Sequence, residues 1–173
     1  MNDFDKNWRR KQELRMRPIA DAKYKGIFGE NISIKRFEMD DNFILDKKYA
    51  IDVEIKLENG QILLGQEKFL SHKYAGFKSI TIEYYQNPKT GEEGDWFKIS
   101  AQIYFVGYCT RDFEDFKPWV LINWPKVVCY TKDGIIKWQE NKNREDGARA
   151  NFKYTSMDNL PDDCIIAKCL EVT

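Results

Sequence analysis

Two adjoining segments between residues 50 and 69 have the pattern of a β-hairpin. Residues 50–57 alternate between apolar and charged side chains, which is typical of a strand with one buried face. Asn59-Gly60 follows as a strong turn signal, and residues 62–69 begin with the more continuous apolar run of a central strand. We therefore expect this hairpin to be the centre of a sheet.

The remaining patterns predict helical and extended segments around that hairpin. Residues 4–29 are expected to be helical, with a break or a new helical start at Pro18. Further strands are expected at 79–85, 119–122, 127–130 and 135–138, with a turn or short helix at 158–163 before a last apolar segment at 164–170. Together they predict a mixed α/β (α+β) fold with a central mixed sheet and flanking helices, in one domain over residues 1–173.

Composition excludes several classes of protein. The 28 basic and 28 acidic residues cancel, which excludes a uniformly basic nucleic-acid coat and an acidic disordered tail. The one histidine, His72, excludes every metal site that needs two imidazoles. The 4 cysteines form no Cys-x-x-Cys pair, and no apolar run is long enough to span a bilayer. We expect a cytoplasmic protein with reduced thiols and no membrane partner.

The neutral total hides a basic segment near the N-terminus. Residues 6–25 hold eight basic and two acidic side chains, a net charge of +6. The expected nucleic-acid contacts are Arg9, Arg10, Lys11, Arg15 and, after the hairpin, Lys73. A solvated helix face is the alternative interpretation, because runs of charge are often only that.

Polar side chains interrupt the apolar hairpin at one end. Asp52 lies in the first strand, and Gln66 and Lys68 lie two residues apart in the second, where they share a face. Burying such groups costs several kcal/mol per ion unless they pair or bind a cation. A carboxylate, a second oxygen ligand and an ammonium group together suit Mg²⁺ or Mn²⁺ and a phosphate.

The length of the hairpin loop decides which residue faces Asp52. A two-residue loop at Asn59-Gly60 places Glu67 opposite Asp52, whereas a three-residue loop at 58–60 places Gln66 there. The apolar alternation slightly favours the first, although a bulge at Gly65 would change the faces. Gln66 and Glu67 both remain candidates for the second metal ligand.

These residues resemble the PD-(D/E)-x-K nuclease superfamily, which includes restriction enzymes and many phage nucleases. The matching pattern is Glu30 at the end of the helix, then Ile51-Asp52, then Gln66-Glu67-Lys68. The resemblance covers residues 15 to 70 and implies a restriction-endonuclease-like core with Mg²⁺- or Mn²⁺-dependent hydrolysis of DNA. It also implies catalytic roles for Asp52, Gln66, Lys68 and Glu30, with Lys68 stabilising charge on phosphorus.

The pattern departs from the superfamily at two positions. Ile51 stands where many members have proline, and the neutral Gln66 occupies the acidic position. A neutral ligand binds a cation less well, so a catalytically inactive module that binds nucleic acid or protein is the alternative. Asp46 is a reserve ligand, a phage or mobile element is an expected source, and a homodimer stays open.

Overall fold

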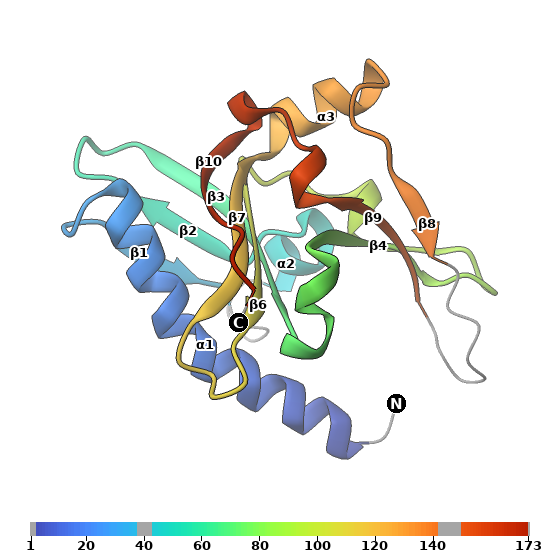
Figure 1. Cartoon of the computed structure of the whole chain (residues 1–173), viewed down its shortest axis with the longest axis horizontal. Coiled ribbons are helices and arrows are strands. Elements are labelled where there is room, and N and C mark those ends of the chain that lie inside the picture. Colours follow the sequence, from blue (N-terminus) through green and yellow to red (C-terminus); the bar gives the residue numbers. More distant parts are fainter. Residues whose placement is uncertain (1–2, 38–42, 142–149, 173) are drawn as a thin grey trace.

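The computed structural model describes residues 3–37, 43–141 and 150–172, and these form a mixed α/β structure (Figure 1). A six-stranded sheet has the spatial order β1 (Ser33–Arg36), β2 (Val53–Lys56), β3 (Ile62–Leu70), β6 (Ile103–Cys109), β7 (Phe116–Asn123) and β10 (Ile165–Cys169). A four-stranded sheet has the order β5 (Glu92–Glu93), β4 (Ser79–Asn87), β9 (Asn151–Ser156) and β8 (Gln139–Asn141).

Helices and single turns connect and cover the two sheets. The α-helices are α1 (Asp3–Phe28), α2 (Phe43–Tyr49) and α3 (Trp124–Lys132). The 3₁₀ turns are η1 (His72–Phe77), η2 (Asp95–Phe97), η3 (Met157–Asn159) and η4 (Asp162–Cys164). The predicted mixed sheet is therefore present, as are the turns before the last strand. Among the described residues, no helix is long and apolar enough to cross a membrane.

The β2–β3 hairpin closes through the longer of the two expected loops. Val53 pairs with Gly65 and Lys56 with Ile62, and the three residues 58–60 form the loop, with Gly60 at a φ of +83°. Only glycine adopts such a conformation without a steric penalty, so Gly60 fixes the turn and with it the register. The two-residue loop favoured by the apolar alternation was wrong. Gly65 hosts no bulge, and its missing Cβ lets Val53 and Ile103 pack against it.

Strand β3 has an antiparallel neighbour on one side and a parallel neighbour on the other. It pairs with β2 along its first half and with β6 from Gly65 to Leu70, where Gln66 lies beside Tyr104. A parallel pair requires a long crossover, which residues 71–102 supply and which contains η1, β4 and η2. The second half of β3 thus extends beyond the end of β2 at Val53.

Two hydrophobic cores lie on the two faces of the six-stranded sheet. On one face α1 buries Met16, Ala20 and Tyr24 against the sheet. Pro18 lies inside this uninterrupted helix. The expected break is absent, and the burial of Met16 and Ala20 on either side of Pro18 holds the two turns together although proline lacks a backbone donor.

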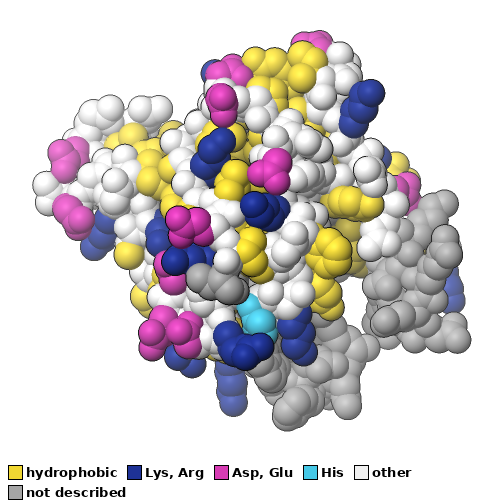
Figure 2. All heavy atoms as spheres, viewed as in Figure 1, with side chains coloured by type: hydrophobic (Ala, Val, Ile, Leu, Met, Phe, Trp, Pro, Cys, Tyr) yellow, Lys and Arg dark blue, Asp and Glu magenta, His cyan; other side chains and the backbone are white. Residues whose placement is uncertain are grey.

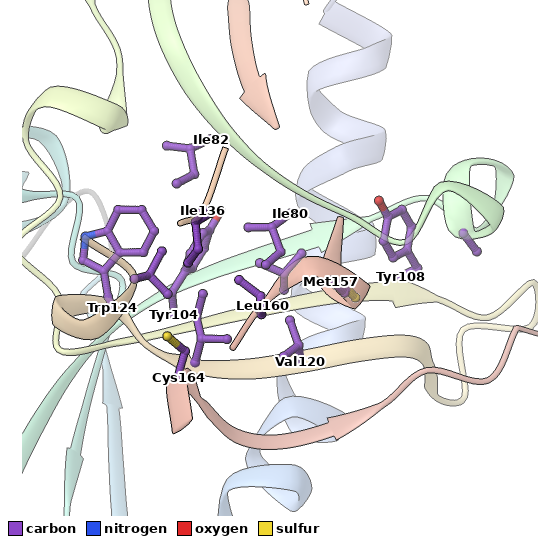
Figure 3. Close-up of a cluster of buried hydrophobic side chains, with 14 residues drawn as sticks. Ile80, Ile82, Tyr104, Tyr108, Val120, Trp124, Ile136, Met157, Leu160 and Cys164 are labelled. Atoms are coloured by element: carbon purple, nitrogen blue, oxygen red, sulfur yellow. The ribbon is translucent and has the colours of Figure 1, made fainter. Parts of the chain in front are cut away.

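The four-stranded sheet and α3 cover the other face. Figure 3 shows Ile80 and Ile82 of β4 packed with Tyr104, Val120 and Trp124. The sheet therefore separates the α1 side from the β4 side (Figure 1).

Two predicted strands are not strands. Residues 127–130 lie inside α3, whose first turn carries Pro125 and is capped by Asn123, which accepts a hydrogen bond from the Lys126 N–H at 3.1 Å. Residues 135–138 form no strand, and β8 begins directly after them. An Asn cap followed by proline was a helix-start signal that the apolar run obscured.

Candidate active site

Asp52 lies where β2 separates from β3. Its N–H donates to the Gly65 carbonyl at 2.8 Å, one residue out of step with the Val53–Gly65 pair, so the regular ladder ends at Val53. Its carboxylate Oδ2 accepts the Glu67 backbone N–H at 2.8 Å, in the position that a strand carbonyl would otherwise fill. The side chain is thus held at the end of the antiparallel pairing.

Gln66 and Lys68 lie on the face of β3 opposite to α1. They are beside Tyr104 and Val106, both members of the core that packs against β4. Gln66 is only 8% exposed, and its Oε1 is a buried acceptor without a hydrogen-bond partner. Within the described part of the chain, Lys68 forms neither a hydrogen bond nor an ion pair. The structure therefore places Gln66 and Lys68 on one face of β3, and the Asp52 carboxylate is bound to the backbone N–H of the residue between them.

The Glu67 side chain lies on the α1 face of the sheet, where its carboxylate accepts hydrogen bonds from other side chains. Arg36 donates to its two carboxylate oxygens from Nε at 2.9 Å and from Nη2 at 3.0 Å, and the Tyr24 hydroxyl donates at 3.1 Å. Arg36 also forms an ion pair with Asp21 at 2.6 Å. Glu67, the alternative second ligand, is thus directed away from the face of Gln66 and Lys68, and its charge is already neutralised.

Burial and neighbouring acidic side chains act together on the Asp52 carboxyl. Burial raises its pKa to about 8, with the negative charges of Glu67, Asp46 and Asp95 adding to the rise and the Glu67 N–H opposing it. Asp52 as a whole residue is half-buried, but the carboxyl itself is enclosed by protein atoms, so the burial of the group decides the direction. The site favours a neutral acid or a carboxylate that shares a cation.

Two acidic residues near the site, Glu83 and Asp46, come from other segments of the chain than β2 and β3. Burial raises the pKa of Glu83 on β4, with the positive charge of Lys68 opposing the rise. Burial also raises the pKa of Asp46 on α2, and the negative charge of Asp95 adds to it. Lys98 lies 3.4 Å from Asp95 and donates to the Lys47 carbonyl at 3.1 Å, which links η2 to α2.

The oxygen groups of the site fit a hard divalent cation only in part. Among the described residues, no three His, Cys, Asp or Glu side chains are close enough together to hold a metal ion. Asp52 supplies one carboxylate, and Gln66 supplies an amide oxygen that has no hydrogen-bond partner among the described residues. Because Mg²⁺ usually keeps several waters and takes only one or two carboxylates, this pair is a minimal ligand set.

Glu30 does not join this group. It is exposed in the turn after α1, next to Gly29, whose missing Cβ lies 3.6 Å from the Glu58 side chain in the hairpin loop. That loop is the opposite end of the hairpin from Asp52, about 20 Å away at the rise of a β-strand. The structure therefore separates Glu30 from the expected catalytic residues.

The basic helix lies on the other side of the sheet from Gln66 and Lys68, so the expected nucleic-acid contacts on α1 do not border their face. Arg10 and Lys11 are exposed. Arg15 is engaged with the Asp112 carbonyl at 2.9 Å and lies over the Phe113 ring. The Arg9 side chain lies outside the described residues.

Lys73 is exposed in η1, directly after β3, and His72 precedes it. Figure 2 shows Lys and Arg side chains gathered around the single histidine on this face. Both lie on the segment that continues from Lys68, so they are closer along the chain to the site than the basic helix is.

The sequence alone missed two parts of this arrangement. The role of Arg36 depends on β1, which was not predicted and which places the guanidinium beside Glu67. Glu83 was visible only as a charged residue after the alternating segment 79–82, a weak signal for proximity to Lys68. Comparison of the chain with protein-family models, curated proteins and solved structures gives no match, so a functional assignment has to come from the geometry of this site.

Proposed function

We propose that this chain is a divalent-metal-dependent nuclease with a restriction-endonuclease-like core, acting on DNA. The observation that carries the proposal is that the Asp52 carboxylate is bound to the backbone of β3 between Gln66 and Lys68, which share one face. The order of the elements supports it, because α1 leads into a mixed sheet and the PD-(D/E)-x-K resemblance implies a mixed sheet with flanking helices.

Each residue has a distinct role in the proposed reaction. Asp52 and the free Gln66 Oε1 would hold Mg²⁺ or Mn²⁺, which would polarise the phosphate and activate water. Lys68 places an unpaired ammonium on the same face, where it stabilises the charge that develops on the phosphate oxygens. The Glu67 N–H keeps the Asp52 carboxylate in one orientation before substrate binds.

A nucleic-acid-binding module without catalysis is the second candidate. The neutral Gln66 at the acidic position favours it, as does the lack of a third acidic, histidine or cysteine ligand among the described residues. Such a protein would keep the fold and bind DNA without cutting it.

Cleavage assays decide between these two functions. We expect the protein to cut DNA with Mg²⁺ or Mn²⁺, EDTA to abolish cutting, and Ca²⁺ to support binding with little turnover because its looser coordination positions water poorly. Lys68→Ala should lower the rate by about 10²–10³-fold without unfolding the protein, because it removes charge stabilisation in the transition state. Lys56→Ala is the matched control, since Lys56 is an exposed lysine on β2.

The variant Gln66→Glu separates a disabled enzyme from a protein that was never one. If the wild type is inert with every divalent ion and Gln66→Glu cuts DNA, the chain is an inactive nuclease and the binding function is correct. If neither protein cuts or binds DNA, both proposals fail.

A further inference from the structure

The η1 turn presents two aromatic rings to solvent directly after the strand that carries Lys68. Phe77 is 71% exposed and Tyr74 is 57% exposed, and Phe77 is the most exposed of the large hydrophobic side chains in the described residues. Single exposed apolar residues are common, but two rings on one short turn beside a candidate site are a specific arrangement.

The turn is held rigidly, so the exposure of its rings is part of the fold. Ala75 between them is 3% exposed and packs into the core on the β4 side. Ser71 Oγ accepts the Lys73 N–H at the start of the turn, and the Lys78 N–H donates to the Ala75 carbonyl at its end. The Lys78 carbonyl then accepts the Met157 N–H at 2.7 Å. These contacts at both ends of η1 and at Ala75 hold the turn in place and leave the rings of Tyr74 and Phe77 exposed to solvent.

The charges around these rings have one sign. Residues 68–82 contain Lys68, Lys73, Lys78 and His72 and no acidic residue. The group of Tyr84 and Phe97 differs because its rings already have partners in the protein: they stack on each other at 5.0 Å, and Lys153 Nζ lies 4.3 Å from the centre of the Tyr84 ring. Solvent-exposed rings beside cations suit a polyanion with stacking surfaces.

The distance between η1 and Lys68 determines which part of a bound DNA the turn can contact. Ser71 lies three residues beyond Lys68, about 10 Å at the rise of a β-strand. DNA rises about 3.4 Å per base step, so a base on the turn is roughly three steps from a phosphate at Lys68.

We propose that η1 binds unpaired nucleotides next to the phosphate held at Lys68, with Tyr74 and Phe77 stacking on bases and Lys73 and Lys78 contacting the backbone. The inference deepens the proposed function by naming its substrate class: DNA with a single-stranded segment beside the cleavage point. The rings accept any base, because every base offers a face for stacking.

Equilibrium binding in EDTA tests this without any cleavage. The probes are a fluorescein-labelled blunt duplex and the same duplex with a single-stranded tail. Tyr74→Ala/Phe77→Ala should weaken binding to the tailed DNA by roughly tenfold or more, because each stacked base contributes about 1–3 kcal/mol, and leave the blunt duplex unchanged. Tyr74→Trp/Phe77→Trp should restore binding, and Ile135→Ala, which truncates an apolar residue that is 57% exposed elsewhere, should have no effect.

The outcomes separate this inference from the proposed nuclease. Unchanged binding of the tailed DNA, or equal losses on both probes, overturns stacking by η1 even if the wild type cuts DNA. A tailed-DNA preference that depends on the two rings supports it even if the wild type never cuts. A change in oligomeric state of the double alanine variant, measured by light scattering, would mean that the rings contact a second copy, and this also overturns it.

Discussion

Adjacent residues of β3 have opposite surroundings on the two faces of one sheet. On the α1 side, the Glu67 carboxylate receives three hydrogen bonds, two from Arg36 and one from Tyr24. On the β4 side, Gln66 Oε1 has no partner, and Lys68 makes no hydrogen bond or ion pair with the rest of the described chain. The buried carboxylate on the α1 side is neutralised by the protein itself, whereas the polar groups on the β4 side lack such partners among the described residues.

One backbone group links the ion pair on the α1 side to Asp52. The Glu67 side chain is fixed by Arg36, and the Glu67 N–H holds Asp52 Oδ2 at the end of β2. The ion pair with Arg36 therefore supports the position of the candidate catalytic carboxylate without touching it. Substitutions on each side of the sheet test this difference between the two faces.

The largest expected change in stability follows from removing the cation that neutralises Glu67 on the α1 side. Arg36→Leu leaves the Glu67 carboxylate, 6% exposed, without its cation, and the free energy of unfolding should fall by about 3–5 kcal/mol. Urea denaturation measures this loss. The double variant Arg36→Leu/Glu67→Leu should recover most of it, because neither charge then remains buried. A loss below about 1 kcal/mol for the single variant would contradict the comparison.

Replacing the buried carboxyl of Asp52 should change the free energy of unfolding in the opposite direction. Asp52→Asn in metal-free protein should raise the free energy of unfolding by about 2 kcal/mol at pH 9, because it removes a buried charge and can still accept the Glu67 N–H. The folded-state pKa of about 8 lies above the ordinary value of 3.8. The wild type therefore loses stability as pH rises from about 4 to 8, and the advantage of Asp52→Asn should grow over that interval.

Thermal melts of both proteins from pH 4 to 9 check this sign. An advantage of Asp52→Asn that shrinks as pH rises would mean that the carboxylate is already stabilised by the protein. Addition of Mg²⁺ at pH 8 should raise the melting temperature of the wild type more than that of the variant.

A smaller effect is expected from restoring an acid beside Asp52. Gln66→Glu should tighten Mg²⁺ binding by roughly tenfold, since a carboxylate replaces the neutral oxygen on the same face. Titration calorimetry measures the affinity, and Gln86→Glu, at an exposed position of β4, is the control. If both variants bind Mg²⁺ equally, Gln66 is not a ligand.

The smallest effect concerns the basic residues on the α1 side. Arg10→Ala/Lys11→Ala should reduce the slope of log affinity for duplex DNA against log salt by up to about 1.8, or 0.9 for each lost phosphate contact. Lys25→Ala, which removes an exposed lysine at the other end of α1, should leave the slope unchanged. An unchanged slope in the double variant would make these two residues a solvated surface.

Local sequence patterns predicted the strands that carry the candidate site, but not the length of the hairpin loop or the interactions with distant segments. The alternation at 50–57 and the Asn59-Gly60 turn predicted β2 and β3, and the spacing of Gln66 and Lys68 predicted their shared face. Sequence could not choose between two loops that differ by one residue, because the choice depends on the conformation of Gly60. The contacts of Arg36 and Glu83 could not be predicted either, since they join segments that are 31 and 15 residues from their partners.

The tip of the β2–β3 hairpin has a consequence for how this chain tolerates change in length. Exposed loop tips usually accept insertions and deletions without loss of function. Here the three residues 58–60 set the pairing of β2 with β3, and a shift of one residue exchanges the faces of a strand. Deleting one residue at this tip, about 20 Å from Asp52, would therefore change which side chains of β3 lie beside the Asp52 carboxyl. We expect Gly60 and the length of the loop to stay fixed even where other residues of the loop vary.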